Sequence, residues 1–350
     1  MSDTPAIAVV GAGLIGRTHV EVVSRCARLS AVVDPSPEAE SVARAADVPW
    51  FSDLETFLAT ERADGIVLAT PNQLHVEQGL ACVEAGVPML IEKPISNDVA
   101  SAETLVNAAE AKGVEILVGH HRRHNPLVAA AKQVIASGRL GDVIAATGQF
   151  WLYKPDDYFE PSWRRSPGAG PVFINLIHDI DLMRHFCGDV EYVQALESRN
   201  ARGFDVEDTM AVLIRFTDGA LGTVSVSDTV SAPWSWEFTS AENPIYPNVQ
   251  TSCYRIGGTH GSLSVPDLTL WRHDDTRGWW EPISGETVPF EVAPPLERQL
   301  DDFVAVIRGE KSPLVSGREG LESLRVIEAI KLAASTEQGV AIDTMERGES

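Results

Sequence analysis

The sequence has few cysteines, few basic side chains and no long apolar run. Its four cysteines are scattered without a paired C-x-x-C spacing, which argues against a disulfide framework or a thiolate metal site and indicates buried thiols in a reducing compartment. Acidic residues outnumber basic ones by 50 to 28, so the charge of the protein disfavours binding to nucleic acid or to an anionic membrane surface. No apolar run approaches the roughly 20 residues that span a bilayer, and residues 1–5 lack a signal-peptide pattern. These absences predict a cytoplasmic protein.

What the chain does contain is typical of a folded protein with a sizeable core. Hydrophobic residues make up 44% of its 350 residues and charged residues 22%, which fits neither a disordered chain nor a fibrous repeat. Because domains commonly have roughly 100–200 residues, the length predicts two of them.

Short apolar runs alternate with helical patterns in the first third of the chain. The predicted strands are 6–10, 29–34, 65–69, 88–92 and 114–118, and the predicted helices between them are 14–25, 37–46, 73–85 and 98–112. The first of these strands is apolar throughout, as expected of a strand covered on both faces. Strands alternating with helices of this length predict right-handed crossovers and a parallel sheet with helices on both sides.

The pattern changes after about residue 125. One helix, 126–137, leads into longer runs that predict antiparallel strands. Met210–Phe216 ends in Thr217-Asp218-Gly219, which is a hairpin signal. We therefore predict one domain over residues 1–124 and a second over residues 125–345.

A G-x-G-x-x-G sequence follows the first predicted strand and opens the first predicted helix. Gly11 permits a tight turn, Gly13 lets the backbone approach a pyrophosphate, and Gly16 lets the helix pack closely on the sheet. The start of the helix offers free N–H groups to the phosphates. Asp34 ends the second strand, where a carboxylate accepts hydrogen bonds from the adenosine ribose; a helix N-cap before Pro35 is the alternative reading. Since this carboxylate repels a 2′-phosphate, the cofactor is expected to be NAD and not NADP.

Further segments carry a resemblance to a known family. Thr70-Pro71-Asn72-Gln73-Leu74-His75, Glu92-Lys93-Pro94 and Gly168–Gly188, together with the glycine motif, resemble the glucose–fructose oxidoreductase / inositol dehydrogenase / MocA (Gfo/Idh/MocA) family. Arg122–Pro126 and Gly257–Leu263 extend the resemblance over essentially the whole chain. The resemblance implies an α/β Rossmann domain followed by an α+β domain with an open, mainly antiparallel sheet. It also implies NAD at the carboxyl edge of the parallel sheet and substrate in a cleft between the domains.

Lys93 and His178 are the predicted catalytic residues. The resemblance implies that Lys93 contacts the substrate hydroxyl and the nicotinamide ribose, where an ammonium group stabilises alkoxide character, and that the bond to Pro94 is cis. His178 matches the family's histidine, whose ring suits proton transfer near neutral pH. The simpler interpretations are a surface lysine at a strand end and a buried core histidine.

The chain departs from the family pattern four residues before His178. The family has an aspartate at that position, and this chain has Ile174 followed by Asn175. An amide can orient a ring or a substrate hydroxyl, but it cannot be the ionised partner of the histidine. Asp181 and His185 lie at helical spacing from His178, yet no further ligand accompanies them, so we expect no metal.

The remaining site predictions rest on the resemblance and on position near the expected cleft. The predicted cofactor-binding residues are Gly11, Gly13, Leu14, Ile15, Gly16, Asp34, Thr70, Pro71, Asn72, His75, Glu92, Lys93, Arg122, Trp163 and Arg164. The predicted substrate-binding residues are Lys93, Arg122, Tyr153, Asn175 and His178.

These features predict an NAD(H)-dependent oxidoreductase that interconverts a secondary alcohol and a ketone on a sugar, cyclitol or similar polyol ring. Three alternatives stay open: a dehydrogenase of a carboxylated cis-dihydrodiol or another acid alcohol, a non-catalytic protein that senses NAD and sugar, and an NAD-dependent glycosidase. The acid alcohol is favoured by the cations Lys154, Arg164, Arg165, Arg122 and Arg123. The resemblance also implies a homodimer or homotetramer formed through the open sheet.

Overall fold

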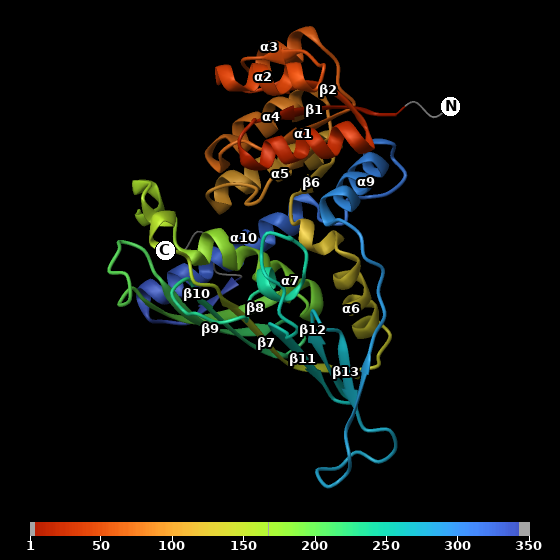
Figure 1. The fold of residues 1–350 in the computed structure, drawn as a ribbon, viewed down its shortest axis with the longest axis vertical. Helices are drawn as coiled ribbons and strands as arrows, with labels where there is room; N and C mark the ends of the chain where they lie inside the picture. Colours follow the sequence, from red (N-terminus) through yellow and green to blue (C-terminus); the bar gives the residue numbers. More distant parts are fainter. Residues whose placement is uncertain (1–3, 167, 343–350) are drawn as a thin grey trace. The chain divides into compact units, whose positions relative to one another are not determined.

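The computed structural model describes residues 4–166 and 168–342, which form two compact units (Figure 1). One unit holds the described residues through His124 together with Ala293–Leu324, and the other holds Asn125–Val292 with the described residues from Arg325 onward. The sequence-based division places all of 125–345 in the second domain, of which 343–345 lie outside the described residues. The structure instead packs Ala293–Leu324 with the first unit, because α9 (Pro295–Ile307) contacts α1 (Leu14–Cys26) and buries Leu300 and Phe303 in that unit's core.

The first unit contains a six-stranded parallel sheet in the order β3-β2-β1-β4-β5-β6. The strands are β1 (Ala6–Val10), β2 (Arg28–Val33), β3 (Trp50–Phe51), β4 (Gly65–Leu68), β5 (Met89–Ile91) and β6 (Ile116–Val118). The intervening helices are α1, α2 (Pro37–Ala45), α3 (Leu54–Thr60), α4 (His75–Ala85) and α5 (Val99–Lys112), with short 3-10 turns at Asn72–Leu74 and His121–His124. Strand order reverses between β1 and β4, and doubly wound sheets bind ligands at such a reversal.

Local sequence explains where these helices begin and end. In α5 the side chain of Asp98 accepts a hydrogen bond from the Ser101 N–H group, which satisfies a backbone donor of the first turn. The apolar side chains at helical spacing in this helix are buried: Val99, Ala102, Leu105, Val106 and Ala109. Helices α4 and α5 end at Gly86 and Gly113, which adopt the left-handed conformation that glycine tolerates best.

The second unit contains a nine-stranded sheet in the order β14-β13-β12-β11-β7-β10-β9-β8-β15. The strands are β7 (Val143–Trp151), β8 (Val190–Ser198), β9 (Thr209–Phe216), β10 (Leu221–Ser227), β11 (Tyr254–Gly258), β12 (Gly261–Val265), β13 (Thr269–Arg272), β14 (Ser284–Thr287) and β15 (Val340–Ala341). Its helices are α6 (Pro126–Ala136), α7 (Ile177–Cys187), α8 (Trp236–Thr239) and the second half of α10 (Gly317–Thr336). Among the described strands of this sheet, β7 and β10 alone pair in parallel, so the prediction of a Rossmann domain followed by a mainly antiparallel sheet is confirmed.

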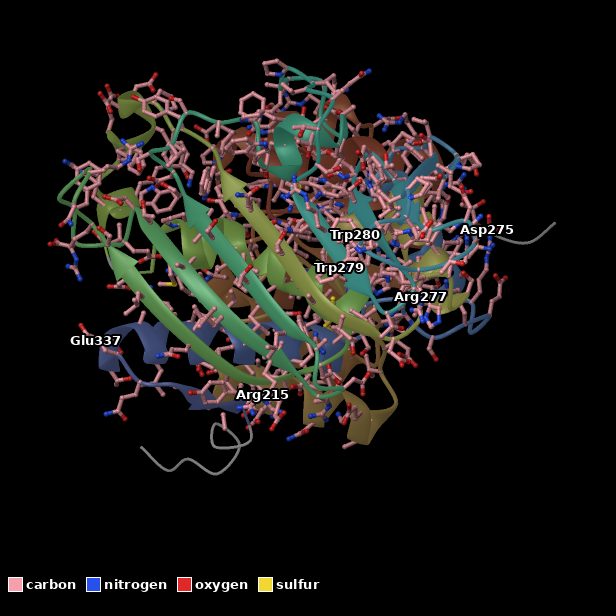
Figure 2. The ribbon with its side chains drawn as sticks, turned by 90° about the horizontal axis from the view of Figure 1, so that it is seen from below. Arg215, Asp275, Arg277, Trp279, Trp280 and Glu337 are labelled. Carbon is pink, nitrogen blue, oxygen red and sulfur yellow. The ribbon has the colours of Figure 1, made fainter. Side chains whose placement is uncertain are left out.

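One face of this sheet is covered by helices and the other is open. Side chains of α7 and α10 share a buried core with alternate residues of the strands. Figure 2 shows the strands with the opposite face turned to the viewer and α10 behind them. On that face Leu196, Leu213 and Leu221 are 62%, 55% and 60% exposed. No helix among the described residues has the length and apolar character needed to cross a bilayer.

Candidate active site

The glycine motif forms the turn between β1 and α1. Gly11 has φ +96°, and its N–H group donates to the Val33 carbonyl at 2.8 Å. A Cβ on Gly16 would lie 2.0 Å from the Gly11 carbonyl oxygen, so only glycine lets the helix approach this closely. A Cβ on Gly13 would meet nothing within 4 Å, and Leu14 and Ile15 are exposed beside it at the start of α1. The turn therefore presents accessible backbone at a helix N-terminus.

Asp34 braces this turn from the end of β2. One carboxylate oxygen accepts a hydrogen bond from the Ala12 N–H group at 2.7 Å, and the other accepts from the backbone and side chain of Ser36. Burial raises the pKa of Asp34, but these hydrogen bonds outweigh burial and hold the pKa below its usual value. An ionised, half-buried carboxylate suits the hydroxyl groups of the adenosine ribose of NAD, and the open glycine turn beside it suits the pyrophosphate.

The loops after β4 and β5 meet around His75. Its Nδ1 lies 2.9 Å from the Pro94 carbonyl oxygen, and its Nε2 lies 2.9 Å from the Thr70 carbonyl oxygen. The ring is buried, and burial lowers its pKa although the two carbonyls oppose that shift. His75 therefore joins the two loops that carry Thr70 and Lys93, while its contact with the cofactor stays a prediction. The peptide bond between Lys93 and Pro94 is cis, as the resemblance implies.

Glu92 is a buried carboxylate directly before Lys93. Its Oε1 lies 2.7 Å from Nε2 of His19, which reaches it from the buried side of α1. Burial opposes ionisation, but the hydrogen bond and charge of His19, with smaller effects of His121 and Lys93, lower the pKa of Glu92 to about 2. The Lys93 N–H group donates to the other oxygen at 3.2 Å, so a fixed negative charge anchors the backbone of the predicted catalytic lysine.

Basic side chains that follow β6 pair with acidic side chains of Ala293–Leu324. Arg123 forms an ion pair with Glu319 at 2.8 Å, and His124 lies 3.1 Å from a carboxylate oxygen of Asp302. Arg122, which directly precedes Arg123 in the sequence, is also buried. Its contact with cofactor or substrate stays a prediction.

In the second unit, the predicted catalytic helix begins with a π-helical turn. This turn spans Val172–Leu176, and α7 follows directly with His178 in its first turn. Glu207 accepts a hydrogen bond from the Val172 N–H group at 3.1 Å and lies against Gly170, where a Cβ would be 2.2 Å from a carboxylate oxygen. The glycine-rich turn is thus needed to admit a buried acid that caps the helix start. π-helical turns are frequent at functional sites.

The side chains around His178 differ in exposure and partners. Asn175 is half-buried and accepts a hydrogen bond from the Lys154 ammonium group at 2.7 Å, whereas His178 is buried. Asp179 accepts a hydrogen bond from the Tyr254 hydroxyl group, so it fastens α7 to β11. Ile174 is half-buried on the same π-helical turn as Asn175.

The predicted cofactor and substrate sets place Tyr153, Trp163 and the half-buried Arg164 in this unit. Trp163 and Tyr153 are both exposed. The Arg164 guanidinium group lies 4.1 Å from the centre of the Tyr158 ring and 5.2 Å from that of Trp163, and it donates to the Tyr158 carbonyl. Their contacts with ligands stay predictions.

Sequence reasoning missed His19 and Glu207, and it named Lys154 only as one of several cations near the expected cleft, without its burial or its partner Asn175. Each meets its partner across a long stretch of chain, and the sequence gives no sign of such pairings. No cluster of three His, Cys, Asp or Glu side chains suited to a metal occurs in residues 4–166 and 168–342.

The parallel sheet, the glycine turn and the ionised Asp34 define an NAD-binding oxidoreductase domain. Two family domains match the sequence: the oxidoreductase-family NAD-binding Rossmann fold over residues 6–120, and the GFO/IDH/MocA C-terminal domain over residues 128–264. The chain belongs to the Gfo/Idh/MocA family.

Characterised relatives agree with this assignment. The chain is 28% identical over 296 residues to 1,5-anhydro-D-fructose reductase of Ensifer adhaerens, covering 84% of each chain. It is 25% identical over 359 residues to inositol 2-dehydrogenase of Rhizobium meliloti, covering 97% of this chain and 99% of the relative. Among solved structures, the WlbA dehydrogenase of Bordetella pertussis in complex with NADH and UDP-GlcNAcA superimposes with a TM-score of 0.76 at 25% identity, covering 97% of this chain and 98% of the other.

Proposed function

We propose that the protein is an NAD(H)-dependent dehydrogenase that interconverts a secondary alcohol and a ketone on a sugar, cyclitol or similar polyol ring. The main supporting observation is that the glycine turn braced by Asp34 and the loop carrying Lys93 follow strands of one parallel sheet. The carboxyl ends of parallel strands share one edge, so both features belong to the same edge. The names of the sugar and inositol relatives support the substrate class.

Each predicted residue has a physical role in this reaction. The glycine turn and Asp34 hold the dinucleotide, with Thr70, Pro71, Asn72 and the other predicted cofactor residues around it. Bound NAD supplies the hydride acceptor. Lys93 polarises the reacting oxygen, and His178 accepts or returns its proton. We assign dinucleotide binding to residues 1–124, and substrate binding and oligomerisation to residues 125–345 apart from Ala293–Leu324, which pack with the first unit.

Reduction of NAD with a panel of ring polyols tests this function through the near-ultraviolet absorbance of NADH. The panel contains inositols, aldoses and anhydrosugars, and the expected result is steady NADH formation with at least one of them. A carboxylated diol as the only substrate would favour the acid-alcohol alternative. Glycoside cleavage without net NADH would favour the glycosidase, and ligand binding without turnover would favour the sensor.

Cofactor preference is tested separately. Asp34 is ionised and the neighbouring Ser36 donates to it, so a 2′-phosphate would meet negative charge here. We expect kcat/KM with NAD to exceed kcat/KM with NADP by roughly tenfold or more, since a repulsion of about 1.4 kcal/mol suffices. Comparable values for the two cofactors would refute this preference.

We also propose a homodimer or homotetramer assembled through the open face of the nine-stranded sheet. Its supporting observation is that Leu196, Leu213 and Leu221 are exposed on that face, where Leu196 and Leu213 help to line a hollow of about 560 Å³. Light scattering coupled to gel filtration should show a dimer or tetramer, and Leu213→Lys should dissociate it. A monomer at all concentrations would contradict the proposal. The four cysteines form no disulfide with one another, which supports a reducing, cytoplasmic location that cell fractionation tests.

A further inference from the structure

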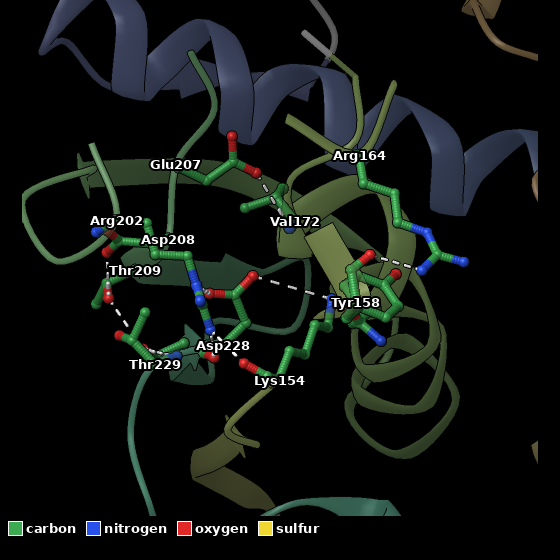
Figure 3. A network of polar contacts seen from close by, with 12 residues as sticks. Lys154, Tyr158, Arg164, Val172, Arg202, Glu207, Asp208, Thr209, Asp228 and Thr229 are labelled. Carbon is green, nitrogen blue, oxygen red and sulfur yellow. Dashed lines mark hydrogen bonds and ion pairs between the residues drawn. The ribbon is translucent and has the colours of Figure 1, made fainter. Parts of the chain in front are cut away.

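Lys154 is a buried lysine to which the proposed chemistry assigns no task. It follows β7 and is 6% exposed. Its ammonium nitrogen lies 2.7 Å from Oδ1 of Asn175, 4.0 Å from a carboxylate oxygen of Asp228, and 4.9 Å from the centre of the Tyr158 ring. Its own carbonyl accepts a hydrogen bond from Arg202 at 2.6 Å, so both ends of the residue are fixed (Figure 3).

Asp228 is satisfied mainly by Arg202. The guanidinium Nε lies 3.0 Å from one carboxylate oxygen of Asp228, and Nη2 donates to the Asp228 carbonyl at 2.7 Å. The Arg202 guanidinium also lies 4.2 Å from the centre of the Phe159 ring, which holds it in place. The ammonium group of Lys154 is therefore left with Asn175 as its nearest acceptor side chain.

Burial and four charged groups set the protonation of this lysine. Burial lowers the pKa of Lys154 to about 8; Asp228 and Glu237 oppose the shift, whereas Arg202 and Arg164 add to it. The ring of Tyr158 completes the surroundings. Lys154 is thus mostly charged at neutral pH and loses its charge slightly above it.

The contact with Lys154 decides how the Asn175 amide is turned. An ammonium group can only donate, so the amide oxygen must face it and the amide nitrogen must point away. None of the described residues accepts a hydrogen bond from that nitrogen. Asn175 is only half-buried, and it precedes His178 by three residues on the helical path, a spacing that puts two side chains on one face.

We propose that Lys154 is a positioning residue that holds the Asn175 amide nitrogen outward as a hydrogen-bond donor to a substrate oxygen beside His178. This inference rests on the proposed function. The pair of Lys154 and Asn175 supplies a neutral donor in the region where the resemblance implies an aspartate and this chain has Ile174. To use this donor, a substrate must carry a hydroxyl or carbonyl oxygen next to the reacting carbon.

A double-mutant cycle tests the proposal, using the ring polyol that the wild type oxidises fastest. Lys154→Met and Asn175→Leu should each lower kcat/KM by roughly 10- to 100-fold, the range expected when a substrate-orienting contact is lost. The kcat/KM of the double variant should lie no more than about threefold below that of the less active single variant, because both changes remove the same donor. Losses that multiply, or an unchanged Lys154→Met enzyme, would overturn the proposal.

Two further variants separate positioning from a purely structural role. Asn175→Asp keeps an acceptor for the ammonium group but removes the amide donor; a structural role predicts full activity, whereas the proposal predicts a loss like that of Asn175→Leu. Lys132→Met is the matched control, because Lys132 is a half-buried lysine of α6 that donates to the His185 carbonyl. It should keep wild-type kinetics. A fully active Asn175→Asp enzyme would count against the proposal.

A spectroscopic measurement distinguishes failure of this inference from failure of the proposed function. In ¹⁵N-labelled protein the side-chain amide resonance of Asn175 should shift with a midpoint near the Lys154 pKa of about 8, and Lys154→Met should abolish that shift. A resonance that does not titrate in the wild type overturns the pairing. If no ring polyol is oxidised, the proposed function fails, and this titration still decides whether Lys154 holds Asn175.

Discussion

Replacing Glu92 by Gln removes the buried negative charge between His19 and Lys93. A carboxyl group whose pKa falls from about 4.5 to about 2 on folding stabilises the folded state by roughly 3 kcal/mol at neutral pH. The sign follows from the direction of the shift: this contribution is complete above the unfolded pKa and is lost as pH falls toward the folded pKa. The free energy of unfolding of Glu92→Gln at pH 7 should therefore be lower than that of wild type by about 3 kcal/mol. The fold should persist, because Gln can still form a hydrogen bond with His19.

Urea unfolding of wild type and Glu92→Gln at two pH values measures this effect. At about pH 3.5 the carboxyl group is largely protonated in the unfolded state. The difference in free energy of unfolding between wild type and Glu92→Gln should therefore be smaller than at neutral pH by about 1 kcal/mol. Glu84→Gln is the control, because Glu84 pairs with Lys112 at the exposed surface and its loss should leave the midpoint unchanged. A Glu92→Gln protein as stable as wild type at both pH values would refute the reasoning.

The remaining predictions concern the cofactor turn and the two predicted catalytic residues. Gly16→Ala should weaken NAD binding below detection by calorimetry, because its Cβ would lie 2.0 Å from the Gly11 carbonyl oxygen; unchanged affinity would show that the turn does not hold the dinucleotide. Lys93→Ala should lower kcat by roughly two to four orders of magnitude, while NAD affinity measured by calorimetry stays near wild type because the glycine turn and Asp34 make the main cofactor contacts; a loss of affinity as large as the loss of kcat would show that Lys93 acts mainly by binding the cofactor. His178→Ala should flatten the near-neutral limb of the kcat/KM pH profile in a protein that circular dichroism shows to be folded, and an unchanged limb would mean that the proton leaves by another route.

Much of the first unit is predictable because its signals are local. Each of these signals lies within about 15 consecutive residues. They are the apolar run of β1, the glycines at which α4 and α5 end, and the apolar side chains at helical spacing in α5. The strand β3 and helix α3 escape prediction, because a two-residue strand gives no periodicity and a seven-residue helix gives very little. The hairpin between β9 and β10 is predicted by Thr217-Asp218-Gly219 and is confirmed.

The features that sequence reasoning missed depend on long-range packing. Helix α9 is amphipathic, but its sequence does not say which core receives Phe303. His19 meets Glu92 across 73 residues, and Lys154 meets Asn175 across 21. The buried state of Lys154 runs against the usual exposure of lysine, so only the fold reveals it.

Turnover with NAD tests the central claim most directly. Purified protein, NAD and an inositol or sugar are mixed, and NADH is followed by its near-ultraviolet absorbance alongside chromatographic detection of the ketone. We predict that NADH and ketone form in equal amounts and that Lys93→Ala, which still binds NAD, forms neither. A wild-type protein that binds NAD but reduces none of it with any ring polyol would contradict the account.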